Sequence, residues 1–323
     1  MKKIKIKKPK INTKDKSYEL KDSCLYKLGS VKKLARLLNL PLEKIEPLKS
    51  DDNYNVFINN GRTIEQPTGL LDIVQTRIAS LLVRIKPSNS LHSGVKKRSH
   101  ITNARVHLGQ HPLLTSDIRG FFKSTSTNQI FLFFRKQLKC SADVSDTLTA
   151  ICSYSGHIPT GSRISMVLAY WANRPMFDEW EAIAKSRNLN FSIFVDDITF
   201  SGHGLNRKFV SLIKRVATRH NHQLHPDKTK LYRANSRKNV TGTSIDGDNL
   251  IVSQKNHKNI YADMILWMES DKCIPHKNLE NRILGKLTAQ AQVDPRYKDK
   301  ARSFRLSIKN FPTHHLCIQK HSA

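Results

Sequence analysis

Hydrophobic residues recur along the chain at two spacings, and these spacings predict both helices and strands. Residues 70–85 carry apolar side chains three and four positions apart, which is typical of a helix with a broad buried face. Two shorter apolar runs, Leu113 to Ile118 and Phe191 to Phe200, have the length and composition of strands. Further helical patterns cover residues 127–137, 144–154, 168–185 and 206–219. This succession predicts an α+β fold.

The two ends of the chain differ in character from its middle. Residues 1–20 are rich in lysine and poor in large apolar side chains, so we expect a basic arm there. After Val240 a short β segment, Thr243 to Val252, precedes two more helical patterns, at 259–268 and 278–291. We therefore predict three parts: a basic arm with a helical lead (1–55), a central mixed domain (56–235) and a basic helical domain (236–323).

The charge of the chain points to a polyanionic partner. Lys and Arg number 55 against 26 Asp and Glu, a formal net charge of +29. An excess of this size on a folded chain favours nucleic acid as the partner, with an anionic membrane surface as the alternative. The five cysteines include no CxxC pair, and no apolar run reaches the ~18 residues of a membrane span. Without a signal-peptide pattern at the N-terminus, we expect a cytoplasmic protein that contacts no membrane.

The strongest candidate for chemistry is the sequence FSIFVDDITFS, residues 191–201. Its two acids, Asp196 and Asp197, lie between two apolar runs, for which a tight β-hairpin is the natural geometry. Carboxylates are normally excluded from an apolar strand pair because burying an unpaired charge is costly. A solvated Asp-Asp turn is one interpretation. The other is a hairpin tip that presents oxygen ligands to Mg²⁺.

A third acid favours the metal-site interpretation. Asp117 lies at the end of the apolar strand in LLTSDIRGFF, residues 113–122. If that strand lies beside the hairpin, three carboxylates converge, and they repel one another unless divalent cations neutralise them. Two metals about 3.5–4 Å apart stabilise the attacking and leaving oxygens of a displacement at phosphorus. We therefore predict a polymerase-type site with two Mg²⁺ ions.

These segments resemble the motifs of reverse transcriptases. FVDD resembles the YxDD of motif C, SDIRGFF resembles motif A, and IPTGSRIS (158–165) resembles the LPQGxxxSP of motif B. Thr160 replaces the Gln of motif B, and Met166 replaces its Pro. The resemblance implies a right-hand polymerase fold, with fingers and an RRM-like antiparallel palm sheet with helices in 56–235 and a helical thumb in 236–323. It also implies RNA-directed DNA synthesis from dNTPs, with these metal ligands: Asp117, Ile118, Asp196 and Asp197.

Further matches imply roles for individual residues. Arg62, in GRTIEQP, lies in a segment that looks like the early fingers strand, and Lys97 and Arg98 lie in one like the second fingers motif, whose basic groups hold the triphosphate. For each of these, a solvated surface charge is the alternative. The resemblance also implies three further site residues: Phe122 as the steric gate against a 2′-OH, Gly161 for close backbone approach to the nascent base pair, and Lys228 as the proton donor to pyrophosphate. A core aromatic is the alternative for Phe122.

Two short motifs resemble the retron branch of the family. NARVH, containing Asn103 and His107, matches NAxxH, and Val240-Thr241-Gly242 matches the VTG triplet. VTG is associated there with recognition of a structured non-coding RNA that is both template and primer. The resemblance implies priming from a guanosine 2′-OH and a branched RNA-linked single-stranded DNA product (msDNA). It further implies an effector or toxin partner in an antiphage defence system.

Three alternatives stay open at this point. The chain could be another bacterial reverse transcriptase, of the group II intron or abortive-infection kind. It could also be a non-catalytic RNA-binding protein on a polymerase scaffold, although such a scaffold has no use for converging carboxylates. Finally, His220, His222 and His225 form an HxHxxH pattern that could hold zinc, but no fourth ligand is near in the sequence.

Overall fold

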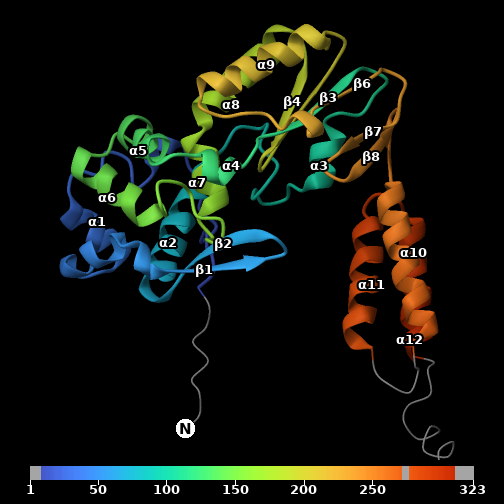
Figure 1. Ribbon diagram of the computed structural model, residues 1–323, viewed down its shortest axis with the longest axis horizontal. Helices are drawn as coiled ribbons and strands as arrows, with labels where there is room; N and C mark the ends of the chain where they lie inside the picture. Colours follow the sequence, from blue (N-terminus) through green and yellow to red (C-terminus); the bar gives the residue numbers. More distant parts are fainter. Residues whose placement is uncertain (1–8, 271–275, 310–323) are drawn as a thin grey trace, which may run out of the picture. The chain divides into compact units, whose positions relative to one another are not determined.

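The computed structural model describes residues 9–270 and 276–309 of the 323-residue chain (Figure 1). This part of the chain forms two compact units. The first consists of residues up to Ser99 together with Leu114–Leu231, and the second of His100–Leu113 together with residues from Tyr232 onward. Each unit combines helices with antiparallel strands, so the predicted α+β class is confirmed. The three-part division by residue range stays a prediction.

A strand hairpin follows the short helices at the start of the first unit. These helices are η1 (Leu20–Asp22), α1 (Val31–Leu38), η2 (Leu42–Lys44), η3 (Glu46–Lys49) and η4 (Asp51–Asn53). Strands β1 (Tyr54–Asn59) and β2 (Arg62–Pro67) then pair antiparallel. Asn60 and Gly61 between them both have positive φ, the geometry of a type I′ turn, which an Asn-Gly pair adopts with little strain. The predicted helix 70–85 is present as α2 (Gly69–Leu82).

The remaining helices of the first unit follow the predicted patterns with two differences. They are α4 (Phe121–Ser124), α5 (Thr127–Leu132), α6 (Ala142–Cys152), α7 (Ser165–Ala172), α8 (Arg174–Ser186), α9 (Arg207–Arg219) and the short η6 (Pro226–Lys228). The predicted helix 127–137 ends in a π-helical turn, Phe133–Gln137. The predicted helix 168–185 is divided at Asn173, because Pro175 lacks the N–H that would continue the first helix and suits the start of a second.

A four-stranded sheet, in the order β4–β5–β3–β6, belongs to the first unit apart from its end residues Leu113 and Tyr232. Its strands are β3 (Leu113–Asp117), β4 (Asn190–Phe194), β5 (Asp197–Ser201) and β6 (Lys230–Tyr232). The apolar run 191–200 is thus two strands joined by a turn, the hairpin that the sequence predicts. Helix α8 packs on β4 and on α9, where the buried Trp180 indole donates a hydrogen bond to the Ile213 carbonyl at 3.3 Å (Figure 1).

Among the described residues, the second unit joins a small β-sheet to four helices. Its elements are α3 (His100–Arg105), β7 (Lys238–Val240), β8 (Thr243–Asp246), β9 (Asn249–Ile251), α10 (Gln254–Glu269), α11 (Lys277–Gln290) and α12 (Arg296–Lys309). The sequence patterns did not predict α12, because its buried residues are few among many charges: Tyr297, Ala301 and Phe304. No helix of the described ranges has both the length and the apolar character that a membrane span requires.

An acid buried between helices of the second unit provides a test of its packing. Asp263 on α10 accepts two hydrogen bonds from Arg282, both at 3.0 Å, and one from Lys286 at 2.7 Å. Burial acts to raise the pKa of Asp263, but the hydrogen bonds from Lys286 and Arg282 outweigh it and lower this pKa. An acid with a lowered folded-state pKa adds stability above its unfolded pKa, and that stability is lost as the pH falls through the folded value.

We predict that Asp263→Ala destabilises the second unit by about 1–3 kcal/mol at neutral pH, because two cations lose their shared acceptor. The measurement is native-state hydrogen exchange of α10 and α11, where the difference from wild type should shrink below about pH 3.9. Asp299→Ala is the control, since Asp299 and Arg302 form a pair with side chains 74% and 69% exposed. That control should change the unfolding free energy by less than about 0.5 kcal/mol, and an equal effect of both variants would contradict the prediction.

Candidate active site

The turn between β4 and β5 is strained and externally supported. Phe194 pairs with Asp197, which leaves Val195 and Asp196 as a two-residue turn. Val195 has φ +60°, a conformation that a β-branched residue rarely adopts, whereas Asp196 does not share it. Positive φ at the first position alone is the pattern of a type II′ turn. The backbone N–H of Val195 donates to the Ser93 hydroxyl at 2.9 Å, so a neighbouring loop holds the turn in place.

The sheet brings the three predicted acids together. Ligand atoms of Asp117, Asp196 and Asp197 all lie within 4.8 Å of one another. Asp117 ends β3, and the next residue, Ile118, donates its backbone N–H to the Asp196 carbonyl at 2.9 Å. This hydrogen bond joins β3 to the turn directly. In the described ranges no other group of His, Cys, Asp and Glu side chains converges in a way that could hold a metal.

Repulsion and burial shape the electrostatics of this cluster. Burial first, and then the charges of Asp196 and Asp117, raise the pKa of Asp197 to about 6. The pKa of Asp196 is also raised, by burial and by Asp117. Lys228 donates to Asp117 at 2.7 Å, and this hydrogen bond is the main cause of a raised Lys228 pKa. One ammonium group against three acids leaves excess negative charge, which fits a hard divalent cation such as Mg²⁺ held by oxygen ligands.

The basic residues predicted to hold a triphosphate occupy different environments. Arg62 is exposed at the start of β2, and its charge acts to lower the pKa of Asp196. Lys97 is exposed. The Arg98 guanidinium donates to the carbonyls of Ser88, Asn89 and Leu91 at 3.2, 3.0 and 2.6 Å. Arg98 therefore organises its own loop, and its role toward a nucleotide stays a prediction.

Phe122 and Gly161 have protein neighbours that the sequence did not reveal. Phe122 is half-buried on α4, with its ring centroid 5.9 Å from that of Phe121. A Cβ at Gly161 would lie 2.7 Å from the Glu65 carbonyl oxygen, so the close backbone approach observed here is to strand β2. The predicted roles of both residues toward a nucleotide remain predictions.

The two retron-like motifs meet within the second unit. Thr241 and Gly242 form the turn between β7 and β8, and both have positive φ, as in a type I′ turn. The Thr241 hydroxyl donates to the His100 carbonyl at 3.1 Å and lies 3.5 Å from the Asn103 amide nitrogen. Val240, Asn103 and His107 are buried, whereas Gly242 is exposed. A role of the buried residues in RNA binding would therefore act through the position of the turn.

The HxHxxH pattern does not form a metal site. His222 is buried, and burial, followed by the nearby His220, lowers its pKa to about 4. Its Nδ1 lies 2.8 Å from the Ser124 hydroxyl and its Nε2 lies 2.6 Å from the Asn173 amide oxygen. His220 instead lies 3.0 Å from Glu179. These histidines serve as hydrogen-bonding groups of the first unit.

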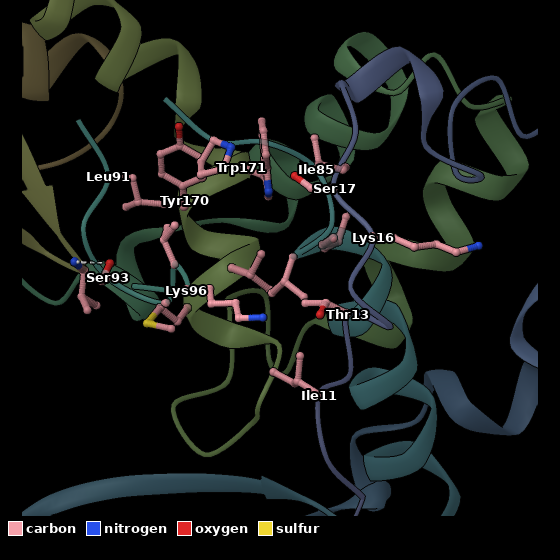
Figure 2. Close-up of a pocket in the computed structure, with 18 of the residues that line it drawn as sticks. Ile11, Thr13, Lys16, Ser17, Ile85, Leu91, Ser93, Lys96, Tyr170 and Trp171 are labelled. Carbon is pink, nitrogen blue, oxygen red and sulfur yellow. Dashed lines mark hydrogen bonds between the residues drawn. The ribbon is translucent and has the colours of Figure 1, made fainter. Parts of the chain in front are cut away.

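A cavity of about 610 Å³ borders the strained turn (Figure 2). Val195, Met166 and Tyr170 are among its lining residues, and the segment from Ile11 to Ser17 forms another side. The segment is held by the Asn12 N–H, which donates to Ser80 at 3.0 Å. Sequence reasoning missed this cavity and also the Ser93 support, because both depend on contacts between distant segments.

The repulsion among the acids leads to a prediction that needs no catalytic assay. In EDTA at pH 7, Asp197→Asn should be more stable than wild type by about 1–3 kcal/mol, because the amide removes a disfavoured charge. The folded pKa of about 6 lies above the ordinary value, so wild type loses stability as the pH rises toward 6, and the variant does not. Thermal unfolding measures this, and added Mn²⁺ should reverse the order, since only wild type keeps all three ligands.

Asp143→Asn serves as the control for this experiment, because Asp143 is exposed on α6 and outside the acidic cluster. It should gain no stability in EDTA and should leave the Mn²⁺ response intact. A wild type and an Asp197→Asn variant with equal stability in EDTA at both pH 5 and pH 7 would contradict the repulsion among the three acids.

Comparison with known proteins tests the family suggested by the motifs. No protein-family model matches the chain. The chain is 26% identical over 204 residues to the retron Ec86 reverse transcriptase of Escherichia coli, covering 62% of this chain and 63% of that one. It is 26% identical over 193 residues to the retron Se72 reverse transcriptase of Salmonella heidelberg, covering 56% and 50%. The chain thus spans from half to just under two thirds of the length of these two relatives.

Among solved structures, the chain is similar to a foamy viral protease–reverse transcriptase, with 12% identity and a TM-score of 0.43. The match covers 80% of this chain and 39% of the viral protein's chain. This score is too low to support an argument from structural similarity. The sequence relatives and the chain's own helices and strands agree with the α+β polymerase fold that the motifs predict. The chain is thus similar in sequence to several retron reverse transcriptases.

Proposed function

We propose that this protein is an RNA-directed DNA polymerase of the retron type. The observation that carries the proposal is the convergence of Asp117, Asp196 and Asp197, whose ligand atoms lie within 4.8 Å of one another. In a right-hand arrangement, hairpin β1–β2 belongs to the fingers, the four-stranded sheet to the palm and helices α10–α12 to the thumb. A non-catalytic scaffold offers no reason to hold three repelling carboxylates together.

The three acids, with Ile118 beside them, are proposed to hold two Mg²⁺ ions. Bound Mg²⁺ supplies activation of the primer hydroxyl and neutralisation of charge on the phosphates. The Lys228 ammonium is held at Asp117 by a hydrogen bond of 2.7 Å, and its Nζ is proposed to give a proton to the leaving pyrophosphate. Arg62 and Lys97 are exposed donors suited to triphosphate oxygens, and Phe122 is proposed to exclude ribonucleotides.

The catalytic proposal is tested by Asp196→Asn and Asp197→Asn. Each should lower primer extension in Mg²⁺ buffer by at least about 10³-fold, because a metal ligand is lost, while RNA binding changes less than about twofold. The measurement is extension of a DNA primer on an RNA template, together with RNA binding by filter retention. Asp143→Asn should synthesise DNA at the wild-type rate. Wild-type yields from either active-site variant would remove the two-metal assignment.

The retron proposal adds a bound RNA and a particular product. The chain is proposed to copy a structured non-coding RNA into a branched RNA-linked DNA, primed from a guanosine 2′-OH and made from dNTPs. A cytoplasmic location and an effector protein in antiphage defence are part of the same proposal. Support comes from the sequence relatives and from the contact between the two retron-like motifs, Asn103 in NAxxH and Thr241 in VTG.

The turn at Thr241 is suited to reading RNA for a physical reason. A β-branched residue with positive φ costs about 1–2 kcal/mol relative to a residue that tolerates this conformation, such as Asn or Gly. Thr241 has φ +47° and is half-exposed next to the exposed Gly242. Because Thr241 destabilises its own turn, its presence there indicates a role other than folding. Structured RNA is recognised through its loops and 2′-OH groups, which an exposed turn can contact.

We therefore predict that Thr241→Asn separates recognition from folding. Asn suits this φ, and that gain offsets the loss of the hydroxyl's hydrogen bond to the His100 carbonyl, so the turn should be about as stable as in wild type. The Thr hydroxyl and methyl group are lost from its surface. DNA synthesis on the RNA that copurifies with wild type should fall at least about tenfold, and extension on an unrelated primer–template should stay within about twofold. Salt-dependent, sequence-independent binding should persist. Equal losses on both templates would assign the turn a purely structural role.

A further inference from the structure

Hairpin β1–β2, which carries Arg62, has most of its residues exposed. Five of the six residues of β1 are exposed, among them Ile58 at 78%. An isolated two-stranded hairpin is at best marginally stable in water, so its position depends on contacts with the rest of the first unit. In β2, two residues are buried, Glu65 and Pro67.

The segment Ile158–Ser165, which resembles motif B, supplies such contacts, together with His157 just before it. The Gly161 N–H donates to the Glu65 carbonyl at 3.1 Å, and the Thr160 N–H donates to the Glu65 carboxylate at 2.9 Å. The Thr160 hydroxyl donates to the Thr63 carbonyl at 2.8 Å. Because a Cβ at Gly161 would lie 2.7 Å from the Glu65 carbonyl oxygen, the two backbones are in direct contact.

The Glu65 carboxylate lies at the centre of this contact. Its residue is only 2% exposed, and the His157 Nε2 lies 3.2 Å from it while the Lys123 ammonium lies 3.9 Å away. Burying a carboxylate costs free energy even when it is paired, and apolar residues often stabilise such a place better. A buried Glu at this position therefore points to a requirement for a defined geometry between the two segments.

The geometry matters because Arg62 lies three residues before Glu65 on the same strand. Arg62 is exposed at the start of β2, next to the Asn60-Gly61 turn at the tip of the hairpin. A strand is stiff over three residues, so fixing Glu65 fixes the point from which the Arg62 side chain extends. The backbone from which Arg62 extends thereby has a set position in the first unit.

We propose that Glu65 is a positioning residue that locks hairpin β1–β2 to the segment His157–Gly161 and so holds Arg62 in place for the incoming triphosphate. Thr160, which replaces the Gln of motif B, belongs to this lock, because its N–H and hydroxyl are both directed at β2. The role in nucleotide binding rests on the proposed polymerase function. The lock itself does not.

The kinetic test uses Glu65→Ala, Glu65→Gln and Arg62→Ala in primer extension with varied dNTP concentration. Glu65→Ala should raise the KM for dNTP about tenfold with kcat within about threefold, because ground-state positioning of the nucleotide is lost. Glu65→Gln keeps an oxygen acceptor for Thr160 and should stay within about threefold of wild type. The double variant Glu65→Ala/Arg62→Ala should have the same KM for dNTP as Arg62→Ala alone, because both changes remove the same contribution of Arg62 to nucleotide binding. Asp178→Asn, at an ion pair on α8, is the control.

A second measurement is independent of catalysis. Hydrogen exchange of the β1–β2 amides should be at least about tenfold faster in Glu65→Ala, whereas the β4–β5 amides should be unchanged. If Glu65→Ala does not fold, Thr160→Val, which removes the hydroxyl donor to Thr63, should give a smaller acceleration in the same hairpin. If wild type makes no DNA, the proposed polymerase function fails, but hydrogen exchange still tests the lock. Unchanged exchange in the hairpin, or additive KM effects of Glu65→Ala and Arg62→Ala, would overturn the proposal.

Discussion

Electrostatic repulsion among three carboxylates is the constraint on which the rest of the first unit depends. Asp117, Asp196 and Asp197 are half-buried or buried at one end of a sheet, where burial first, and then the charges of its two neighbours, raise the pKa of Asp197. Two backbone hydrogen bonds and one ammonium group hold the three acids there, but they remove only part of the repulsion. The Ile118 N–H joins β3 to the turn, Ser93 supports the strained Val195, and Lys228 offsets part of the charge at Asp117. Bound divalent cations would balance the remainder.

The cost of this arrangement is offset by the apolar core of the first unit. The core is continuous from the helices at its N-terminal end to α9, and it includes the buried aromatic residues Trp171, Trp180, Phe200 and Phe209. Large buried side chains of this kind each contribute about 1.5–3 kcal/mol, so the core can tolerate a strained turn and a repelling cluster. The helices around the sheet end bury these apolar side chains against one another.

The departures from the reverse transcriptase motifs have visible neighbours. Thr160, in place of Gln, donates to the Thr63 carbonyl and to Glu65. Met166, in place of Pro, borders the cavity beside Val195, and its Cε lies where a side chain at Gly94 would otherwise extend. Thr160 therefore contacts strand β2, and Met166 contacts the loop that supports the turn. Identity of 26% to the retron relatives leaves room for such local rearrangements.

The sequence by itself determined the local features of this protein. The apolar run 113–118 predicted β3. The acidic pair between two apolar runs predicted the β4–β5 hairpin, because a turn is the natural place for such a pair. The three acids were identifiable from these two patterns. The periodicity of α2, α6 and α9 likewise predicted their helices. The tertiary structure decided what depends on distant pairing: β3 beside β5, Glu65 against Thr160, and Asn103 near Thr241, 138 residues away. Hydrophobic periodicity reports which face of an element is buried and carries no information about which partner covers it.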